Sequence, residues 1–485
     1  MKKLFKSDSN FKKILLILII SLAIPLTVIV LQKQQELRQH ASEGASLYVS
    51  VNGKDSNPGT KDAPLATINK ANFMALPGTT VHVQPGTYTG FVLTDKSGTE
   101  NSRITYVSDM PLTAKIVADG ALGNTDSTWQ NKGNYVDIIG FDISGGKRIG
   151  ILNRGSFVNI KNNLVHDVSS SDCTSGLGGA GIDSAENKDN PPHDNVYSEN
   201  LVKNVGPLNI KPCSYVHAIY IQSTREKVLN NIIVNNAGIG VACTHACDSP
   251  TISNNLILNN GYGISLGWSS TNILGTTSNA IVSNNIIMKN AKYSAIYERS
   301  NAGAIGSNNK FLNNIFWQNA GGDKCTLYNG DVCTNTIVKD PLLSNPLTDG
   351  TGSYQLSSTS PAIDSGISLG APKIDYANNI RPQGKNFDIG PYEYTTPQAP
   401  SPTPNPTLTP SSVPTPKSSC IPRPACLNSK PPCLPIQNAV YCSPTPTICP
   451  QVITPARNPY SGQCLNFPNP CAVPKGWTTV KSCSL

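Results

Sequence analysis

The chain has 485 residues, of which 14% are charged and 6% aromatic, and it contains 39 glycines and 38 prolines. Turn-forming residues at this density interrupt every apolar run, which disfavours a helical protein and favours many short strands. The formal net charge of +8 comes from the two ends, because residues 44–394 carry 25 basic and 27 acidic side chains. This centre has no net field that would collect nucleic acid, so no nucleic-acid partner is expected.

Residues 1–35 have the pattern of an N-terminal transmembrane anchor or a signal segment. Five lysines precede an apolar run of eighteen residues from Ile14 to Leu31. A run of this length can just cross a bilayer, and the lysines before it keep the N-terminus inside the cell. No small-x-small cleavage site follows directly, so an uncleaved anchor is preferred over a cleaved signal. Either interpretation places the rest of the chain at the cell surface or in the medium.

Residues 46–88 predict the N-terminal cap of a solenoid. An alternating strand and a turn cluster precede a short amphipathic helix, and a second strand ends in a Pro-Gly turn; the strings are LYVSVNG, DSNPGT, PLATINKANFMAL and TTVHVQPGTY. The first coil of a solenoid has an open apolar end, which a short helix laid across it would close.

A repeat of paired asparagines follows the cap. Six strings of the type KVLNNIIV align on Asn163, Asn200, Asn231, Asn255, Asn285 and Asn314, and the shortest spacings set a coil of 23–24 residues. No coil keeps a helical apolar period, so three short strands per coil remain. The repeat predicts an all-β, right-handed parallel β-helix over residues 45–394. Asparagine tolerates the left-handed backbone of a tight turn, and stacked amides can form a ladder.

A second set of positions in the same coils predicts an outer face. Isoleucines that begin short strands are expected to point inward, namely Ile149, Ile182, Ile219, Ile239, Ile264 and Ile296. The residues that follow them would then form an outward column of Gly150, Asp183, Tyr220, Gly240, Ser265 and Tyr297. Successive members of such a column lie about 4.8 Å apart.

The C-terminal third of the chain loses the repeat. Residues 340–394 are expected to cap the end of the coil, and the Pro/Thr/Ser-rich residues 395–419 predict a stiff, extended linker. Residues 420–485 hold eight of the 14 cysteines and few apolar residues. They predict a module stabilised by disulfides, whose pairing the sequence does not choose.

Three parts of the sequence resemble known β-helix proteins. The string from Tyr48 to Tyr88 resembles the opening of DUF1565-type, pectate-lyase-like proteins, and the asparagine repeat resembles the right-handed β-helix repeats of that superfamily. The string from Ser360 to Tyr394 is similar to the terminal segment of surface proteins called choice-of-anchor Q. The resemblance implies the fold and a polysaccharide or glycan as partner. It leaves the activity open, because the superfamily includes lyases, epimerases, glycosidases, tailspikes and adhesins.

The longest coil spacing, between Asn163 and Asn200, adds a loop rich in acidic residues. A polysaccharide lyase neutralises a uronate carboxylate and removes the neighbouring proton, typically with Ca²⁺ and a basic side chain. Candidate calcium ligands are Asp183, Glu186 and Asp194, and candidate catalytic residues are Asp183, Lys203, Arg225 and His217. The alternatives are a solvated loop with ordinary surface acids and a structural histidine. The acid cluster of family 9-like pectate lyases and the motifs of polygalacturonases and alginate epimerases are absent from the sequence.

The predicted outer column also suggests a surface for an extended glycan. Sugar rings stack on aromatic faces, and their hydroxyls bond to amide and guanidinium groups. Candidate substrate-binding residues are Tyr220, Gln222, Trp268, Tyr297 and Arg299. The alternative is that these tyrosines pack beneath loops.

The cysteines outside the C-terminal module agree with an oxidising compartment. We expect Cys173 to pair with Cys213 and Cys325 to pair with Cys333. The string CTHAC holds Cys243 and Cys247 around His245. A local disulfide or two bridges to other coils are expected there in preference to a metal site.

Two functions remain open from the sequence. The first is a surface-anchored monomer that binds, and in the catalytic case cleaves, an extended polysaccharide by Ca²⁺-assisted β-elimination. The second is a non-enzymatic adhesin or structural protein of the cell envelope.

Overall fold

The computed structural model describes residues 46–118, 126–170, 173, 178–184, 191–267, 275–299 and 304–395, and the backbone of 454–457, 464–467 and 478–479. The chain divides into two compact units, Met1–Gln398 and Ala399–Leu485. The predicted N-terminal anchor, the predicted linker beyond residue 395 and most of the cysteine-rich module lie outside the described residues. Within the described ranges, no helix is long and apolar enough to cross a membrane.

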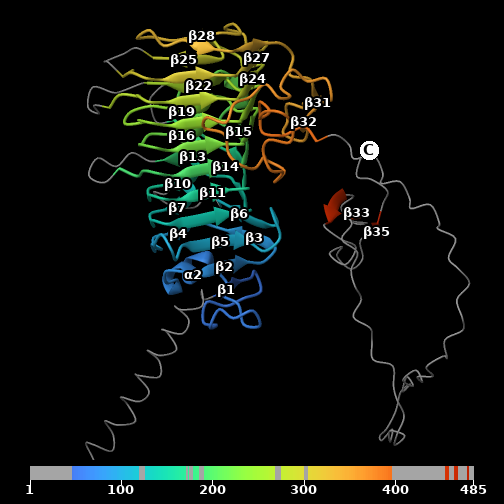
Figure 1. Ribbon diagram of the computed structural model, residues 1–485. Coiled ribbons are helices and arrows are strands. Elements are labelled where there is room, and N and C mark those ends of the chain that lie inside the picture. The colour runs from blue at the N-terminus through green and yellow to red at the C-terminus, as the bar shows by residue number, and fades with distance from the viewer. Residues whose placement is uncertain are drawn as a thin grey trace, which may run out of the picture. The chain divides into compact units, whose positions relative to one another are not determined.

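The first unit confirms the predicted parallel β-helix. Its strands form three parallel sheets, which we call A, B and C, and the chain visits them in that order in each coil (Figure 1). Sheet A contains β1 (Ser46–Val49), β2 (Thr80–Val83), β5 (Ile104–Ser108), β8 (Val136–Ile139), β11 (Asn159–Lys161), β14 (Val196–Ser198), β17 (Lys227–Leu229), β20 (Thr251–Ser253), β23 (Ile281–Ser283), β26 (Lys310–Leu312) and β29 (Cys333–Thr334).

The other two sheets complete each coil. Sheet B contains β3 (Gly86–Thr89), β6 (Ala114–Val117), β9 (Asp142–Ser144), β12 (Leu164–Val168), β15 (Leu201–Val205), β18 (Ile232–Val234), β21 (Leu256–Leu258), β24 (Ile286–Met288), β27 (Ile315–Trp317) and β30 (Ile337–Val338). Sheet C contains β4 (Val92–Thr94), β7 (Ser127–Asn131), β10 (Ile149–Asn153), β13 (Gly179–Ser184), β16 (Val216–Ile221), β19 (Ile239–Cys243), β22 (Tyr262–Leu266), β25 (Ile296–Glu298) and β28 (Cys325–Thr326). A short 3-10 helix, η1 (Leu208–Ile210), interrupts the coil between β15 and β16.

The N-terminal cap forms as predicted. Helix α2 (Ile68–Met74) starts at Thr67, whose side chain accepts a hydrogen bond from the backbone N–H of Lys70. The helix buries Ile68, Ala71 and Asn72 against the N-terminal end of the stack (Figure 1). The amide oxygen of Asn72 accepts a hydrogen bond from the hydroxyl of Tyr106, a buried residue of β5. The helix therefore closes the open apolar end of the first coils and also provides a partner for a buried phenol.

The predicted asparagine ladder lies at the corner between sheets A and B. Each ladder residue from Asn163 to Asn285 donates its backbone N–H to the amide oxygen of the next one, as Asn255 does to Asn285 at 3.0 Å. The side-chain N–H of Asn255 donates to the same oxygen at 2.9 Å and to the carbonyl of Val228 at 2.8 Å. The asparagine before each of the paired ladder residues has the left-handed backbone that such a turn needs, as at Asn254 with φ 58°.

A second buried ladder lies at the corner between sheets B and C. It runs through Asn236, Asn260, Asn290 and Asn319 and ends on the carboxylate of Asp323. This second ladder was not among the features predicted from the sequence. Its signal is an asparagine five residues after each later member of the first ladder, in strings such as NNIIVNNAG.

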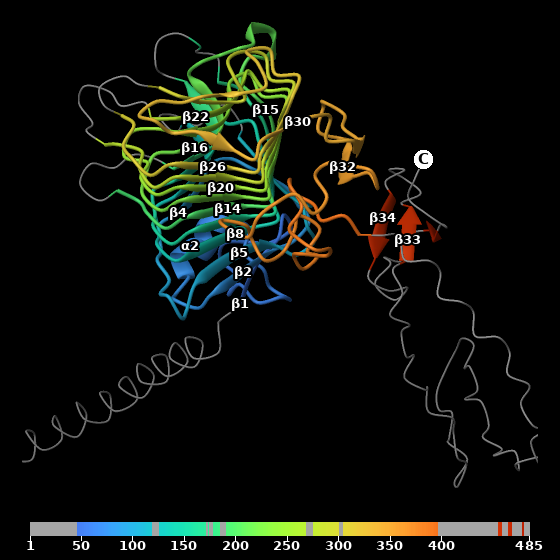
Figure 2. The same cartoon turned by 45° about the horizontal axis from the view of Figure 1, so that its top comes forward.

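The C-terminal residues of the unit correct one expectation. Residues 340–394 do not cap the end of the coil; they lie along its side against the outer face of sheet B (Figure 1, Figure 2). Apolar side chains of β18, β21, β24 and β27 face outward there and form one buried cluster with Leu343 of β31 (Leu343–Asn345) and with Tyr354 and Leu356 of β32 (Ser353–Leu356). Residues 340–394, which we call the covering segment, bury this apolar surface and so remove it from water.

Polar contacts fix the C-terminal segment at the corner between sheets A and B. Arg381 forms a fully buried ion pair with Glu393 at 2.6 Å and donates to the amide oxygen of Asn230. The side-chain amides of Asn254 and Asn284 donate to backbone carbonyls of the segment. In each Asn-Asn pair of these coils, the second asparagine belongs to the buried ladder and the first binds the covering segment.

The second unit contributes a small antiparallel sheet. Its strand order is β34 (Cys464–Phe467), β33 (Thr454–Arg457) and β35 (Thr478–Thr479).

The ladder generates a stability prediction. Asn255→Leu should lower the free energy of unfolding by about 3 kcal/mol or more, because it leaves several buried amide and carbonyl groups of neighbouring coils unpaired. The midpoint of chemical denaturation, followed by circular dichroism, measures this change. Asn235→Gly is the matched control: Asn235 is partly exposed, shares one amide bond with each neighbour and has a φ that glycine tolerates. Equal shifts of the denaturation midpoint in the two variants would contradict a special contribution of the buried ladder to stability.

Candidate functional site

The outer face of sheet C carries the predicted column, with two corrections. Residues paired in register are Leu152, Asp183, Tyr220, Ala242, Ser265 and Tyr297. Gly150 and Gly240 do not belong to the column. A Cβ atom on Gly150 would lie 2.6 Å from the Val165 side chain of sheet B, and one on Gly240 would lie 2.5 Å from that of Ile257. Both glycines therefore face the interior.

The same local geometry moves two predicted core residues to the outer face. These strands turn two consecutive residues inward, as at Gly240 and Val241, so the period of two fails. Ile149 and Ile239 consequently join a second outer column with Ala180, His217 and Tyr262. Ile239 packs with Tyr262 and Tyr297 in a cluster that is separate from the interior core.

A pocket of about 190 Å³ opens on this face across β10, β13, β16 and β19. It is lined by Arg148, Gly178, Gly179, Asp183, Tyr215, His217, Tyr220 and His245. Arg148 is fixed at its rim by hydrogen bonds to the carboxylate of Asp126 and the carbonyl of Gly178, both at 2.9 Å. We call this set the Asp183 pocket.

Asp183 is a buried carboxyl group held by one amide. The side-chain N–H of Gln222 donates to its Oδ1 atom at 2.8 Å. Burial raises the pKa of Asp183 to about 6, although the Gln222 hydrogen bond and the charges of Arg154 and Arg148 act in the opposite direction. Gln222, a predicted substrate-binding residue, is itself buried and orients this carboxyl group.

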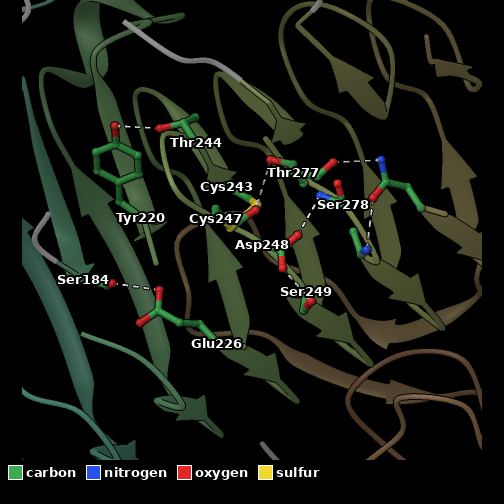
Figure 3. The surroundings of a disulfide bond; sticks show 12 residues. Ser184, Tyr220, Glu226, Cys243, Thr244, Cys247, Asp248, Ser249, Thr277 and Ser278 are labelled. Carbon is green, nitrogen blue, oxygen red and sulfur yellow. Dashed lines mark hydrogen bonds between the residues drawn. A yellow bond between two sulfur atoms is a disulfide. The ribbon is translucent and has the colours of Figure 1, made fainter. Parts of the chain in front are cut away.

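The hydroxyl of Tyr220 lies between two side chains of one short loop. It is 2.9 Å from Oγ1 of Thr244 (Figure 3) and 2.8 Å from Nε2 of His245. Both residues belong to the loop that follows β19, where His245 has the left-handed φ of 60°. A phenol next to an imidazole is a pair through which a proton can move.

His217 lies on the floor of the pocket against Tyr220. The two ring centroids are 4.1 Å apart and the planes are inclined by 38°. Burial lowers the pKa of His217 to about 3, with further lowering from the charges of Arg299 and His245. Its Nδ1 atom is buried and has no hydrogen-bond partner among the described residues. His217 is therefore a neutral imidazole at neutral pH.

The structure does not bring the two predicted basic residues to Asp183. Lys203 belongs to β15 of sheet B, and its ammonium group donates to the carbonyl of Asp349 in the covering segment. Arg225 lies at the corner between sheets C and A and forms an ion pair with Asp194 at 2.6 Å. Each is close to Asp183 in the sequence but on a different side of the coil.

The described residues do not fit the predicted calcium site. Asp194 is bound to Arg225 and His193, and Glu186 lies outside the described residues. Asp183 meets an amide N–H and two guanidinium charges, whereas calcium needs several further oxygen ligands. Within the described part of the chain, no group of three or more carboxylate, imidazole or thiolate side chains could hold a metal ion.

An aromatic cluster lies on the same face, three rungs beyond Tyr220 toward the C-terminal end of the stack, where a rung is one strand of sheet C. Tyr297 is only 6% exposed, whereas Tyr293, which the sequence analysis did not select, is 45% exposed. The Tyr293 ring stacks near Tyr262 at 5.3 Å and lies 4.9 Å from Tyr297. The guanidinium group of Arg299 lies over the Tyr297 ring. Trp268 lies outside the described residues.

A second pocket of about 530 Å³ adjoins this aromatic cluster. It is lined by Tyr293, Ser294, Tyr297, Glu298, Arg299, Gly321, Lys324, Thr326 and Tyr328. The signal for Tyr293 is the string YSAIYER, in which one tyrosine lies four residues before the other. We call this set the Tyr293 platform.

Three disulfides stabilise the coils. Cys173 pairs with Cys213 and Cys325 with Cys333, as predicted. Cys243 pairs with Cys247, which decides between the local disulfide and the two bridges to other coils that the sequence left open. The first joins the segments before β13 and β16 beside the Asp183 pocket, and the second closes the loop that carries Thr244 and His245.

Comparisons with known proteins support the fold. Residues 47–209 match the family model described as "Pel9A-like, right handed beta helix region". An uncharacterized protein, YwoF of Bacillus subtilis (strain 168), is 39% identical over 89 residues, which are 18% of this chain and 19% of that protein. The chain thus spans about a fifth of the length of this relative.

Solved structures to which the chain is similar at low identity include three lyases. Pectate lyase Pel9A is 16% identical with a TM-score of 0.49 over 72% of this chain and 96% of that one. A rhamnogalacturonan lyase is 15% identical with a TM-score of 0.41 over 62% and 90%. An alginate lyase from Paenibacillus sp. str. FPU-7 is 13% identical with a TM-score of 0.33 over 56% and 96%.

The raised pKa of Asp183 generates a second prediction. Because its folded-state pKa lies near 6, ionisation of Asp183 removes stability as the pH rises from about 4 through about 6. Asp183→Asn should leave the free energy of unfolding unchanged near pH 4 and increase it by up to about 3 kcal/mol at pH 8. Denaturation midpoints at the two pH values measure the difference.

Asp194→Asn is the control with the opposite sign. The Arg225 hydrogen bond lowers the pKa of Asp194, so its ionised form stabilises the fold above pH 4. That variant should lose stability at pH 8. A gain of equal size at both pH values for Asp183→Asn would disprove the assignment.

Proposed function

We propose that this protein is an exported carbohydrate-active protein that holds an acidic polysaccharide along the outer face of sheet C and cleaves it at the Asp183 pocket. The observation that carries the proposal is the convergence of four side chains in one pocket: the protonatable carboxyl of Asp183, the neutral imidazole of His217, and the Tyr220 hydroxyl bonded to His245. Such a set can exchange protons with a bound sugar.

The face itself supports an extended ligand. The covering segment packs on sheet B, whereas the Asp183 pocket and the pocket of the Tyr293 platform both open on the outer face of sheet C. Tyr220 and Tyr297 are three rungs apart in one register, which corresponds to about 14 Å. A polymer that follows the column would contact the Asp183 pocket and the Tyr293 platform together.

The chemistry that best suits the pocket is β-elimination. A base takes the proton beside the uronate carboxylate, the electron pair forms a carbon–carbon double bond, and the bond to the leaving oxygen breaks. That oxygen then receives a proton. Tyr220 with His245 is the proton-transfer pair, and protonated Asp183, oriented by Gln222, donates a hydrogen bond to the uronate carboxylate. Arg148 lines the same pocket and adds positive charge.

Hydrolysis suits this pocket less well. Glycosidases commonly use two carboxyl groups on either side of the scissile bond. Among the described residues that line the pocket, Asp183 is the one with a carboxyl group. No step is assigned to Ca²⁺, which stays a prediction because Glu186, one of its three predicted ligands, lies outside the described residues.

The three disulfides support an oxidising location outside the cytoplasm. We propose that residues 1–35 anchor the protein at the cell surface. A non-enzymatic adhesin or structural envelope protein is the second candidate, favoured by the two buried ladders and the disulfides, which add rigidity without chemistry.

The first functional test is turnover. The exported part of the chain is incubated with pectate, alginate and a glycosaminoglycan, with calcium and with a chelator, and the ultraviolet absorbance of unsaturated product is followed. Tyr220→Phe should lower kcat by at least about 100-fold, since it removes the proton-transferring hydroxyl. Tyr293→Phe, which keeps its ring, should retain kcat. Binding without product on every polymer would favour the adhesin.

The second functional test is binding. Tyr293→Ala should weaken retention on a column of the bound polysaccharide by about tenfold, or about 1.4 kcal/mol, with kcat unchanged. The exposed Phe73 on α2 provides the control, because Phe73→Ala removes a ring at the far end of the stack. Unchanged retention of the Tyr293 variant would exclude the platform as a sugar site.

A further inference from the structure

The loop after β19 is closed on itself by a disulfide. Cys243 and Cys247, four residues apart, are both fully buried, and their Cα atoms are 5.5 Å apart. The three residues between them include Thr244, which Figure 3 shows bonded to the Tyr220 hydroxyl. They also include His245, a second partner of that hydroxyl. One disulfide therefore spans the whole segment that contacts this phenol.

The loop conformation needs an external constraint. His245 has a left-handed backbone, which is unfavourable for a residue with a Cβ atom and persists when the surroundings fix it. The next coil supplies part of this constraint: Sγ of Cys243 is 3.8 Å from the Thr277 hydroxyl, and a Cβ atom on Gly275 would lie 2.6 Å from the His245 carbonyl oxygen. The disulfide supplies the rest by joining the two ends of the loop.

We propose that the Cys243–Cys247 disulfide, with Thr244, positions His245 so that it exchanges a proton with Tyr220. In this arrangement Nε2 of His245 accepts from the phenol, while the Thr244 hydroxyl donates to the phenol oxygen. Both contacts align the oxygen of Tyr220 at the pocket. The inference rests on the proposed function, and it makes catalysis depend on oxidation of this one cysteine pair.

The test compares two disulfides in the exported part of the chain. The double variant Cys243→Ser, Cys247→Ser should lower kcat by at least about tenfold on the polysaccharide that the wild type cleaves, shift the pH profile of kcat and leave KM within about twofold. The matched control is Cys325→Ser, Cys333→Ser, which removes a disulfide three rungs away. It should lower the denaturation midpoint but retain both kcat and the pH profile.

A double-mutant cycle tests the route through the loop. His245→Gln alone should reproduce the loss, and adding it to the Cys243/Cys247 variant should give little further effect, because both changes act on the same contact. Full additivity would overturn the proposal. So would equal losses of kcat in the two disulfide variants.

A spectroscopic measurement separates failure of this inference from failure of the proposed function. With labelled tyrosine, the ring-carbon resonance of Tyr220, assigned by Tyr220→Phe, should move in the Cys243/Cys247 variant and stay in place in the Cys325/Cys333 variant. This readout does not require turnover. If the Tyr220 resonance moves but no polymer is cleaved, the disulfide positions Tyr220 as proposed and the proposed lyase activity is wrong. If the Tyr220 resonance does not move, the proposed positioning role of the disulfide is wrong.

Discussion

The structure depends on one requirement: a side-chain amide buried inside a coil must find partners in the coils above and below. Asn163 through Asn314 meet this requirement only if successive coils stack in register. A slip by one residue would leave several donors and acceptors unpaired in a medium without water. The ladder therefore fixes the height and rotation of each coil. The ladder thereby also aligns the outer columns of sheet C, although no ladder residue lies on that face.

Because the columns are aligned, residues distant in the sequence can form one site. Asp183, Tyr220 and His245 belong to three successive coils, and the neutral His217 lies beside Tyr220 in the same strand. Their protonation behaviour follows from the same stacking, because burial between rungs raises the pKa of Asp183 and lowers that of His217. A rigid scaffold of this kind can hold a proton-transfer pair without a mobile loop.

The sequence predicted the features that repeat and the contacts that are local. The cap helix, the first ladder and two disulfides, Cys173–Cys213 and Cys325–Cys333, could be predicted, since each depends on residues one coil apart or less. Lys203 and Arg225 were chosen for closeness in sequence to Asp183, but each lies after a further turn of the chain that places it on another face of the coil. The alternation rule failed at Gly150 and Gly240, because these strands turn a small residue and the residue after it inward, as they also do at Ala218 and Ile219.

The covering segment divides the coils into two kinds, which differ in the side chains that sheet B turns outward. Where it lies, sheet B has outward Ile, Leu and Met side chains; before it, the same sheet carries outward Asp142 and His166. A coil copied within the covered region would need a longer segment to shield it, whereas a coil copied among the polar rungs would need none. Growth of the solenoid by duplication is therefore easier toward its N-terminal half, and the covered coils are constrained to a fixed number by the length of the chain that follows them.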